Sequence, residues 1–226
     1  YCSKLSSAYM PKLTSTTSSM IAACSGLTSL YAPSLSYIQG YTFYQCSKLD
    51  SVYYPDVSIV NQYGFGLCAS LKTISLPSAT SFYQNAFYAC AALSAVYFPM
   101  VKYIGSSAFS TCGKLESVNF PEALSIQTSA FIRCSSLTTT SFPLVKLIGA
   151  GAFWSCFELS TISFPSATSI SASAFRYCYN LLSLYLLGSS VVSLSAGAFG
   201  STPIDGWTTS TGGVYGSIYV PASLYS

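Results

Sequence analysis

The chain has 226 residues, of which 51% are hydrophobic and only 7% are charged, and its formal net charge is +3. It contains no histidine, which excludes an imidazole base, an imidazole metal ligand and a histidine pH switch. The apolar content argues against disorder, no apolar run is long enough for a membrane-spanning helix, and the small positive excess does not indicate nucleic-acid binding.

The nine cysteines recur at a constant interval of 22 residues. They are Cys2, Cys24, Cys46, Cys68, Cys90, Cys112, Cys134, Cys156 and Cys178. With each cysteine taken as position 0 of a repeat, position 3 is always leucine, position 6 is mostly aliphatic and position 8 is mostly large and apolar. Proline occupies position 9 in the first eight repeats, isoleucine is common at position 14, and Ala-Phe occupies positions 18 and 19 in most. This sustained period predicts a repeat solenoid.

Within each repeat, positions 5 to 8 alternate between polar and apolar residues, which is the period of a β-strand. The proline at position 9 ends that strand, because it cannot donate to a ladder. Gly, Ser, Asn and Gln at positions 15 to 17 indicate a turn, and positions 18 to 21 fit a short helical or 3₁₀ turn without requiring one. A single repeat buries too little surface to offset its conformational entropy, so the coils must stack, about 4.8 Å apart.

The charged residues provide an independent test of this register. Every charged residue within the nine repeats falls at position 2, 4, 10, 12, 20 or 21, and none falls at a position assigned to the core. A wrong register would bury several of them at a large cost in free energy.

The chain is expected to form one domain over residues 1–226. Nine regular repeats run from residue 2 to about 199, and residues 200–226 are expected to form an irregular C-terminal coil whose terminal strand lies within Ser217–Pro221. A secretion signal and a surface anchor are expected to belong to a longer parent protein rather than to this chain.

The pattern Ile-Gly-x-x-Ala-Phe-x-x-Cys-x-x-Leu-x-x-Val-x-Phe-Pro is clearest at residues 104–121 and 148–165. It resembles the BspA-type bacterial leucine-rich repeat over residues 2 to about 199. The resemblance implies an α/β-type leucine-rich-repeat solenoid that is right-handed and curved, with a parallel sheet on one face and short helical or 3₁₀ turns and loops elsewhere. It also implies a bacterial secreted or surface protein. Some members of the family are adhesins that bind host proteins.

The cysteines are predicted to form a file of buried thiols, one in each coil, that act as small hydrophobic side chains. A metal site is not expected, because the file supplies no converging second ligand. Disulfides between adjacent coils are disfavoured, because parallel side chains fit the disulfide dihedral poorly. The folded protein is therefore expected to react negligibly with a bulky thiol reagent.

No catalytic residue, metal or cofactor is predicted. Asp56 and Glu122 share position 10, and Asp50 and Glu116 share position 4, but each pair is three coils apart, which is about 14 Å. Glycoside hydrolysis needs two carboxyl groups within about 5–10 Å. Serine is abundant but has no histidine to activate it. The chain is accordingly expected not to be an enzyme.

Position 7 points outward from the predicted strand, and it is rich in tyrosine beside a row of Ser and Thr at position 5. The candidate ligand-binding residues in this row are Tyr9, Tyr31, Tyr53, Tyr97, Asn119 and Tyr185. Tyrosine gives rigid contact area and serine gives adaptable hydrogen bonds, as in antibody paratopes. The alternative is purely structural, because tyrosine favours strands and neighbouring rings stack on a ladder. Outward aromatic residues at Tyr44, Tyr88 and Trp154 are compatible with that alternative.

The sequence therefore predicts a non-catalytic binding or adhesion module of a bacterial secreted or cell-surface protein. Its partner would be a host protein or a glycan, held by the tyrosine- and serine-rich sheet face, and neither nucleic acid nor a membrane-spanning segment is expected. A structural spacer without a ligand of its own is the alternative. The identity of the ligand and the oligomeric state stay open.

Overall fold

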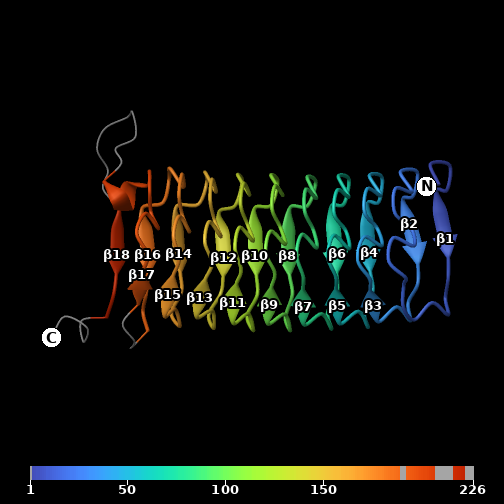
Figure 1. The fold of residues 1–226 in the computed structure, drawn as a ribbon, viewed down its shortest axis with the longest axis horizontal. Helices are drawn as coiled ribbons and strands as arrows, with labels where there is room; N and C mark the ends of the chain where they lie inside the picture. The colour runs from blue at the N-terminus through green and yellow to red at the C-terminus, as the bar shows by residue number, and fades with distance from the viewer. Residues whose placement is uncertain (1, 189–191, 207–215, 222–226) are drawn as a thin grey trace.

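The computed structural model describes residues 2–188, 192–206 and 216–221. Each 22-residue repeat forms one coil, and the coils stack side by side into an elongated solenoid with β1 and β18 at opposite ends (Figure 1). The solenoid is built from parallel strands and turns, as the repeat pattern predicts.

The first strand of each coil lies at positions 5 to 7. These strands are β1 (Ser7–Tyr9), β2 (Ser29–Tyr31), β4 (Ser51–Tyr53), β6 (Thr73–Ser75), β8 (Ala95–Tyr97), β10 (Ser117–Asn119), β12 (Thr139–Ser141), β14 (Thr161–Ser163), β16 (Ser183–Tyr185) and β18 (Ser217–Tyr219). The middle residue is buried in most of these strands, and half of the strands combine a buried middle residue with two exposed neighbours, as in β4. The predicted out-in-out alternation is confirmed.

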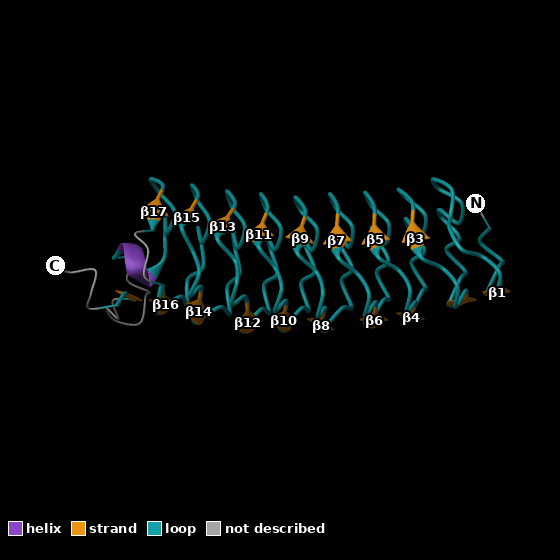
Figure 2. Cartoon of the chain, turned by 90° about the horizontal axis from the view of Figure 1, so that it is seen from below, coloured by secondary structure: helices purple, strands orange, loops and turns teal. Residues whose placement is uncertain are grey.

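A second strand of two residues lies at positions 13 and 14, where sequence analysis expected no sheet. These strands are β3 (Tyr37–Ile38), β5 (Ile59–Val60), β7 (Ser81–Phe82), β9 (Tyr103–Ile104), β11 (Ser125–Ile126), β13 (Leu147–Ile148), β15 (Ser169–Ile170) and β17 (Ser193–Leu194). They form one continuous eight-stranded parallel sheet. Figure 2 shows its strands and the first set on opposite sides of the stack.

Hydrogen-bonded turns occupy positions 16 to 21 of each coil, and among the described residues the only helix is the 3₁₀ helix η1 (Pro203–Asp205). Two residues in each turn region are left-handed, at positions 17 and 21; for example, Ser129 has φ 58° and Arg133 has φ 60°. Backbone N–H groups there donate to the next coil, as Phe109 does to Ala130 at 2.8 Å. The bonds between coils offset the cost of the left-handed conformation.

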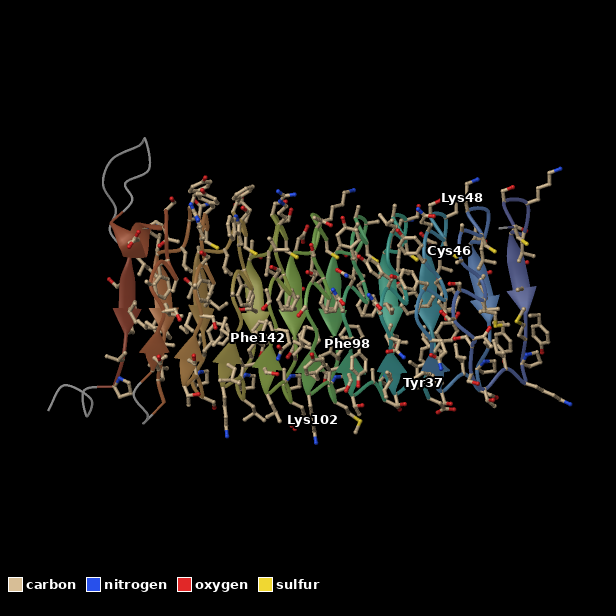
Figure 3. All side chains as sticks on the ribbon, in the orientation of Figure 1. Tyr37, Cys46, Lys48, Phe98, Lys102 and Phe142 are labelled. Atoms are coloured by element: carbon tan, nitrogen blue, oxygen red, sulfur yellow. The ribbon has the colours of Figure 1, made fainter. Side chains whose placement is uncertain are left out.

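The core is a set of columns that run the length of the stack. The phenylalanines at position 19 stack face to face from Phe43 to Phe199, with ring centroids 4.9–5.5 Å apart and planes within 15°. A second column at position 8 includes Phe98 and Phe142. Figure 3 shows these two rings inside the stack and Lys102 at its periphery. No charged residue is buried in the described part of the chain, which confirms the register.

The thiols form the predicted file, and each of seven successive thiols also donates a hydrogen bond. From Cys46 to Cys178, the Sγ lies 3.0–3.3 Å from the carbonyl oxygen of the residue 25 positions earlier. Cys2, in the first coil, is exposed. The expectation that every thiol is shielded is therefore wrong for Cys2.

The C-terminal part departs from the regular repeat. β17 pairs with β15 in a register of Ser169 with Ser193, because the ninth repeat is two residues longer than the others. β18 lies where the terminal strand is expected and pairs in parallel with β16. The remainder of the expected irregular coil, residues 207–215 and 222–226, lies outside the described residues.

Candidate functional site

The position-7 side chains lie in one row on the outer surface of the first set of strands. Strand register pairs Tyr9 with Tyr31, Tyr97 with Asn119, and Tyr185 with Tyr219. The exposed fractions of Tyr9, Tyr31, Tyr53 and Tyr97 lie between 53% and 74%. Serines at position 7 divide the row, so the six candidate residues form three groups rather than one continuous strip.

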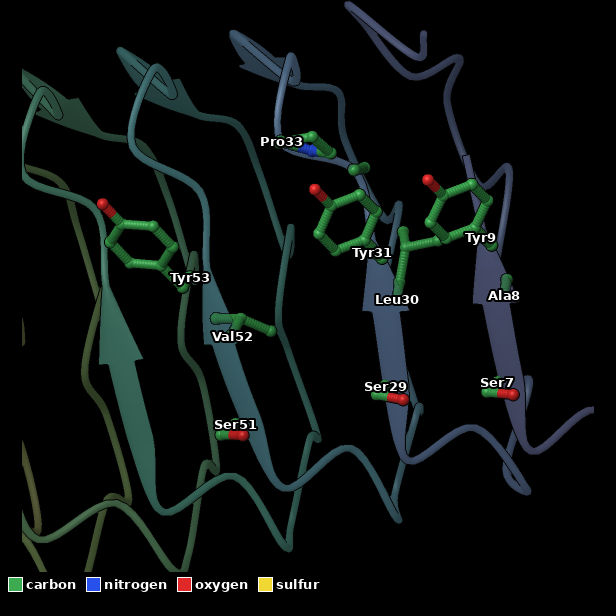
Figure 4. A pocket seen from close by; sticks show the side chains of 11 residues that line it. Ser7, Ala8, Tyr9, Ser29, Leu30, Tyr31, Pro33, Ser51, Val52 and Tyr53 are labelled. Carbon is green, nitrogen blue, oxygen red and sulfur yellow. The ribbon is translucent and has the colours of Figure 1, made fainter. Parts of the chain in front are cut away.

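The first group surrounds a hollow of about 730 Å³ at the N-terminal end of the face. Its lining residues are Ser7, Ala8, Tyr9, Ser29, Leu30, Tyr31, Ala32, Pro33, Ser51, Val52 and Tyr53. None of them is charged, and the volume is within the range of about 300–1,000 Å³ typical of ligand pockets. Figure 4 shows the tyrosine rings at one end of the strands and the serine hydroxyls at the other.

Two of the tyrosine rings in this hollow stack on each other and the third stands apart. The Tyr9 and Tyr31 centroids are 5.0 Å apart and their planes differ by 4°. Within the described residues, Tyr53 stacks on no other ring, and Figure 4 shows it separated from the pair. Faces of Tyr31 and Tyr53 are therefore both available to a ligand.

The separation of Tyr53 follows from a gap in the strand ladder. β1 pairs with β2 and β4 pairs with β6, but β2 and β4 do not pair. In the neighbouring pairs a position-8 N–H donates across the ladder, as Met10 does to Tyr31 at 2.8 Å and Tyr54 does to Ser75 at 3.1 Å. The corresponding bond from Ala32 to Tyr53 is absent.

The buried side chain of Tyr54 bridges this gap from inside. Its hydroxyl donates a 3.2 Å hydrogen bond to the carbonyl oxygen of Leu30 in β2. Most other repeats have Phe or Leu at this position, and neither could make the bond. Burial raises the pKa of Tyr54 well above its ordinary value, so the hydroxyl stays protonated and able to donate.

The second group contains Tyr97 and Asn119. They line a smaller hollow of about 470 Å³ over β8, β10 and β12, together with Ser117, Thr139 and Ser141. Here a single aromatic ring stands among small polar side chains.

The third group is a stacked pair at the C-terminal end of the face. Tyr185 stacks on Tyr219, with centroids 4.6 Å apart and planes differing by 12°. Tyr219 is not among the candidate residues predicted from the sequence, and the register of β16 with β18 adds it to the row beside Tyr185.

Sequence analysis did not predict a second concentration of aromatic residues along the turn edge. The Arg176 guanidinium lies 5.1 Å from the Trp154 ring centroid and 4.8 Å from that of Tyr177. A separate cluster there contains Tyr41, Tyr44 and Tyr63, with centroids 5.0–5.5 Å apart. The 22-residue period could have revealed both clusters, since their members recur at positions 17, 20 and 21.

Charged groups are sparse, and none lines either of the two hollows. The single ion pair among the described residues joins Lys72 Nζ to Asp50 Oδ1 at 2.7 Å, and both side chains are more than half exposed. No cluster of three or more Cys, Asp or Glu side chains suited to a metal ion occurs in the parts of the chain that the structure describes.

The repeat pattern matches a known family along most of the chain. The model of the BspA type leucine rich repeat region matches residues 1–50, 14–138 and 102–212, in six copies. The chain belongs to the BspA-type leucine-rich repeat family. It is accordingly a repeat module of a kind associated with protein interaction.

Two solved structures support the same fold. A leucine-rich repeat protein from Eubacterium ventriosum superposes with a TM-score of 0.61 at 18% identity, covering 83% of this chain and 58% of that one. A T. pallidum leucine-rich repeat protein gives a TM-score of 0.50 at 23% identity, covering 85% of this chain and 76% of that one. A leucine-rich cell surface protein from Faecalibacterium prausnitzii gives 0.40 at 22% identity, with 88% and 78% covered.

No curated protein matches the chain. Within the described residues, no helix has the length and apolar character needed to cross a membrane.

Proposed function

We propose that this chain is a non-catalytic binding module of a bacterial secreted or cell-surface protein. It holds a host protein or a glycan through the position-7 row, and Tyr9, Tyr31 and Tyr53 are its main anchors. Family membership supports the binding role and the location at the cell surface.

The observation that carries the proposal is the uncharged hollow bounded by these three tyrosines. Their rings are more than half exposed, although each is a large side chain on a regular sheet. Aromatic rings with few rotatable bonds lose little conformational entropy when they bind, which is why they dominate the energetics of many interfaces. Tyr97 and Asn119 extend the contact to the second hollow, and Tyr185 extends it to the third group.

The test is a binding screen of the whole chain against immobilised extracellular-matrix proteins and a glycan array. The double variant Tyr31→Ser/Tyr53→Ser should lose the binding of the original chain. The matched control is Tyr83→Ser/Tyr103→Ser, which removes two exposed tyrosines whose ring centroids are 5.8 Å apart. Tyr103 is in β9 of the other sheet, and Tyr83 directly follows β7. Binding retained by the first variant, or lost equally in the control, would show that the anchors are elsewhere.

A second candidate is a spacer that separates other domains and has no ligand of its own. The elongated stack with β1 and β18 at opposite ends favours it, because such a shape sets a fixed distance (Figure 1). The same screen separates the two candidates, because a spacer would bind neither the matrix proteins nor the glycans.

A further inference from the structure

The gap between β2 and β4 differs from the other two gaps on the same face. The ladder is also interrupted between β6 and β8 and between β12 and β14. At those gaps the flanking position-7 residues are Ser75 with Tyr97, and Ser141 with Ser163. Among the described strands, only the first gap has an aromatic ring on each side.

This arrangement makes a slot between two aromatic faces. Tyr31 is held on its other side by the stacked ring of Tyr9, so its open face is directed toward the gap. Tyr53 stands on the far strand with no stacked neighbour (Figure 4). The hydroxyl of Tyr54 holds β2 and β4 together beneath the slot through its bond to Leu30. The slot is therefore a built feature of the fold.

The chemistry of the lining identifies the kind of ligand. The floor is apolar, with Leu30 and Val52 each 7% exposed, and no lining residue carries a charge. The hydroxyls of Ser29 and Ser51 lie at the other end of the strands from the tyrosine rings (Figure 4), and both residues are exposed. The site therefore offers aromatic faces and exposed hydroxyls, and no charged side chain.

We infer that this slot binds the ring of a neutral sugar, seated between Tyr31 and Tyr53 with its hydroxyls toward Ser29 and Ser51. A pyranose ring has C–H faces, which carry partial positive charge and suit the negative face of an aromatic ring. Its edge carries hydroxyls, which exchange hydrogen bonds with serine. An aromatic peptide side chain would use the rings but leave the serine hydroxyls unmatched. This inference rests on the proposed binding function and specifies its ligand class.

The test begins with an array of neutral glycans, and the glycan with the strongest signal is then titrated by calorimetry. Tyr53→Ala should weaken its affinity at least tenfold, because one wall of the slot is removed. Tyr103→Ala should leave the affinity unchanged, because Tyr103 is an exposed tyrosine in β9 of the other sheet and does not line the slot. Circular dichroism confirms that both variants remain folded.

A second comparison separates a sugar from a peptide. Ser29→Ala/Ser51→Ala should weaken glycan binding several-fold, and a capped Ser-Trp-Ser peptide should bind the original chain more weakly than the glycan. The inference is overturned if no glycan on the array binds, if glycan binding survives Tyr53→Ala, or if the chain binds the peptide more tightly than the glycan. If the matrix-protein screen is positive and depends on Tyr31 and Tyr53 while the glycan array is silent, only this inference fails. If both are silent, the proposed function fails as well.

Discussion

The hydroxyl of Tyr54 donates to the carbonyl oxygen of Leu30 across a gap where the two strands make no ladder bond. Leu30 is buried, so its carbonyl has no easy access to water. A buried acceptor that loses its donor costs the free energy of its desolvation. The hydroxyl therefore links β2 to β4, two strands whose backbones form no ladder.

We expect Tyr54→Phe to lower the free energy of unfolding by about 1–2 kcal/mol, because it removes the donor and keeps the ring. Urea denaturation followed by circular dichroism measures the change. The matched control is Tyr53→Phe, whose hydroxyl is on an exposed side chain and whose removal should change stability by less than about 0.5 kcal/mol. Equal effects in the two variants would show that the bond to Leu30 contributes nothing.

Native thiol labelling should modify Cys2 and spare the other eight cysteines, which are buried. Burial also raises the pKa of the Cys46 and Cys112 thiols to about 12, so little reactive thiolate forms at neutral pH. Mass spectrometry after a brief reaction with a maleimide counts the modified thiols before and after denaturation. Cys2→Ser should abolish native labelling, and rapid modification of any other thiol would contradict the buried file.

Stability should fall at alkaline pH. Six thiols have a raised pKa in the folded state: Cys46, Cys68, Cys90, Cys112, Cys134 and Cys156. The unfolded chain releases these protons near the ordinary value of 9.0, whereas the folded chain keeps them. Their contribution is therefore fully present below about pH 9 and is lost as the pH rises toward the folded-state pKa.

Each of these thiols should add about 1.4 kcal/mol per pH unit to the fall in unfolding free energy above pH 9. Urea denaturation at several pH values between 8 and 11 gives the slope. Cys112→Ala should reduce the slope by the share of one thiol while leaving the other ionisable groups in place. An unchanged slope would mean that Cys112 does not remain protonated in the folded state.

Gly149 is expected to tolerate no side chain without displacement of the backbone. A Cβ at this position would lie 2.6 Å from Gln127 C and Thr128 N in the preceding coil. Gly149→Ala should therefore destabilise the protein by about 1–3 kcal/mol. Gly113→Ala is the control, because its nearest neighbour would be Ser135 Oγ at 3.7 Å. Thermal unfolding of both variants tests the difference, and similar melting temperatures would refute it.

The regular part of the fold could be predicted from the sequence because one pattern is repeated in every coil. Buried Leu, Cys and Phe recur at the same positions, and Pro ends the first strand. The second sheet could not be predicted in this way, because strands of two residues, such as Ser125–Ile126, are too short to show a period. The repeat pattern also could not predict the exposure of Cys2, because Cys2 occupies the same repeat position as the eight buried cysteines.

From the sequence, the candidate site could be predicted only as a row of outward-facing position-7 side chains, without the slot between Tyr31 and Tyr53. The alternation in β2 and β4 shows that Tyr31 and Tyr53 point outward. Their separation depends on the gap in the ladder between β2 and β4, which no local sequence pattern records. Tyr54 is the one sequence signal of this gap, because most other repeats have Phe or Leu at the same repeat position 8.

Contacts in this molecule are made between adjacent coils, and the strand register repeats after 22 residues along the regular array. A duplication or deletion of one whole repeat in the gene would therefore replace each neighbour by an equivalent one. Inserted between Tyr53 and Tyr97, an extra repeat would move the two hollows apart by one strand spacing, about 4.8 Å, and leave both linings intact. Recombination between repeats can thus change the distance between contact points while the chemistry of each is inherited unaltered.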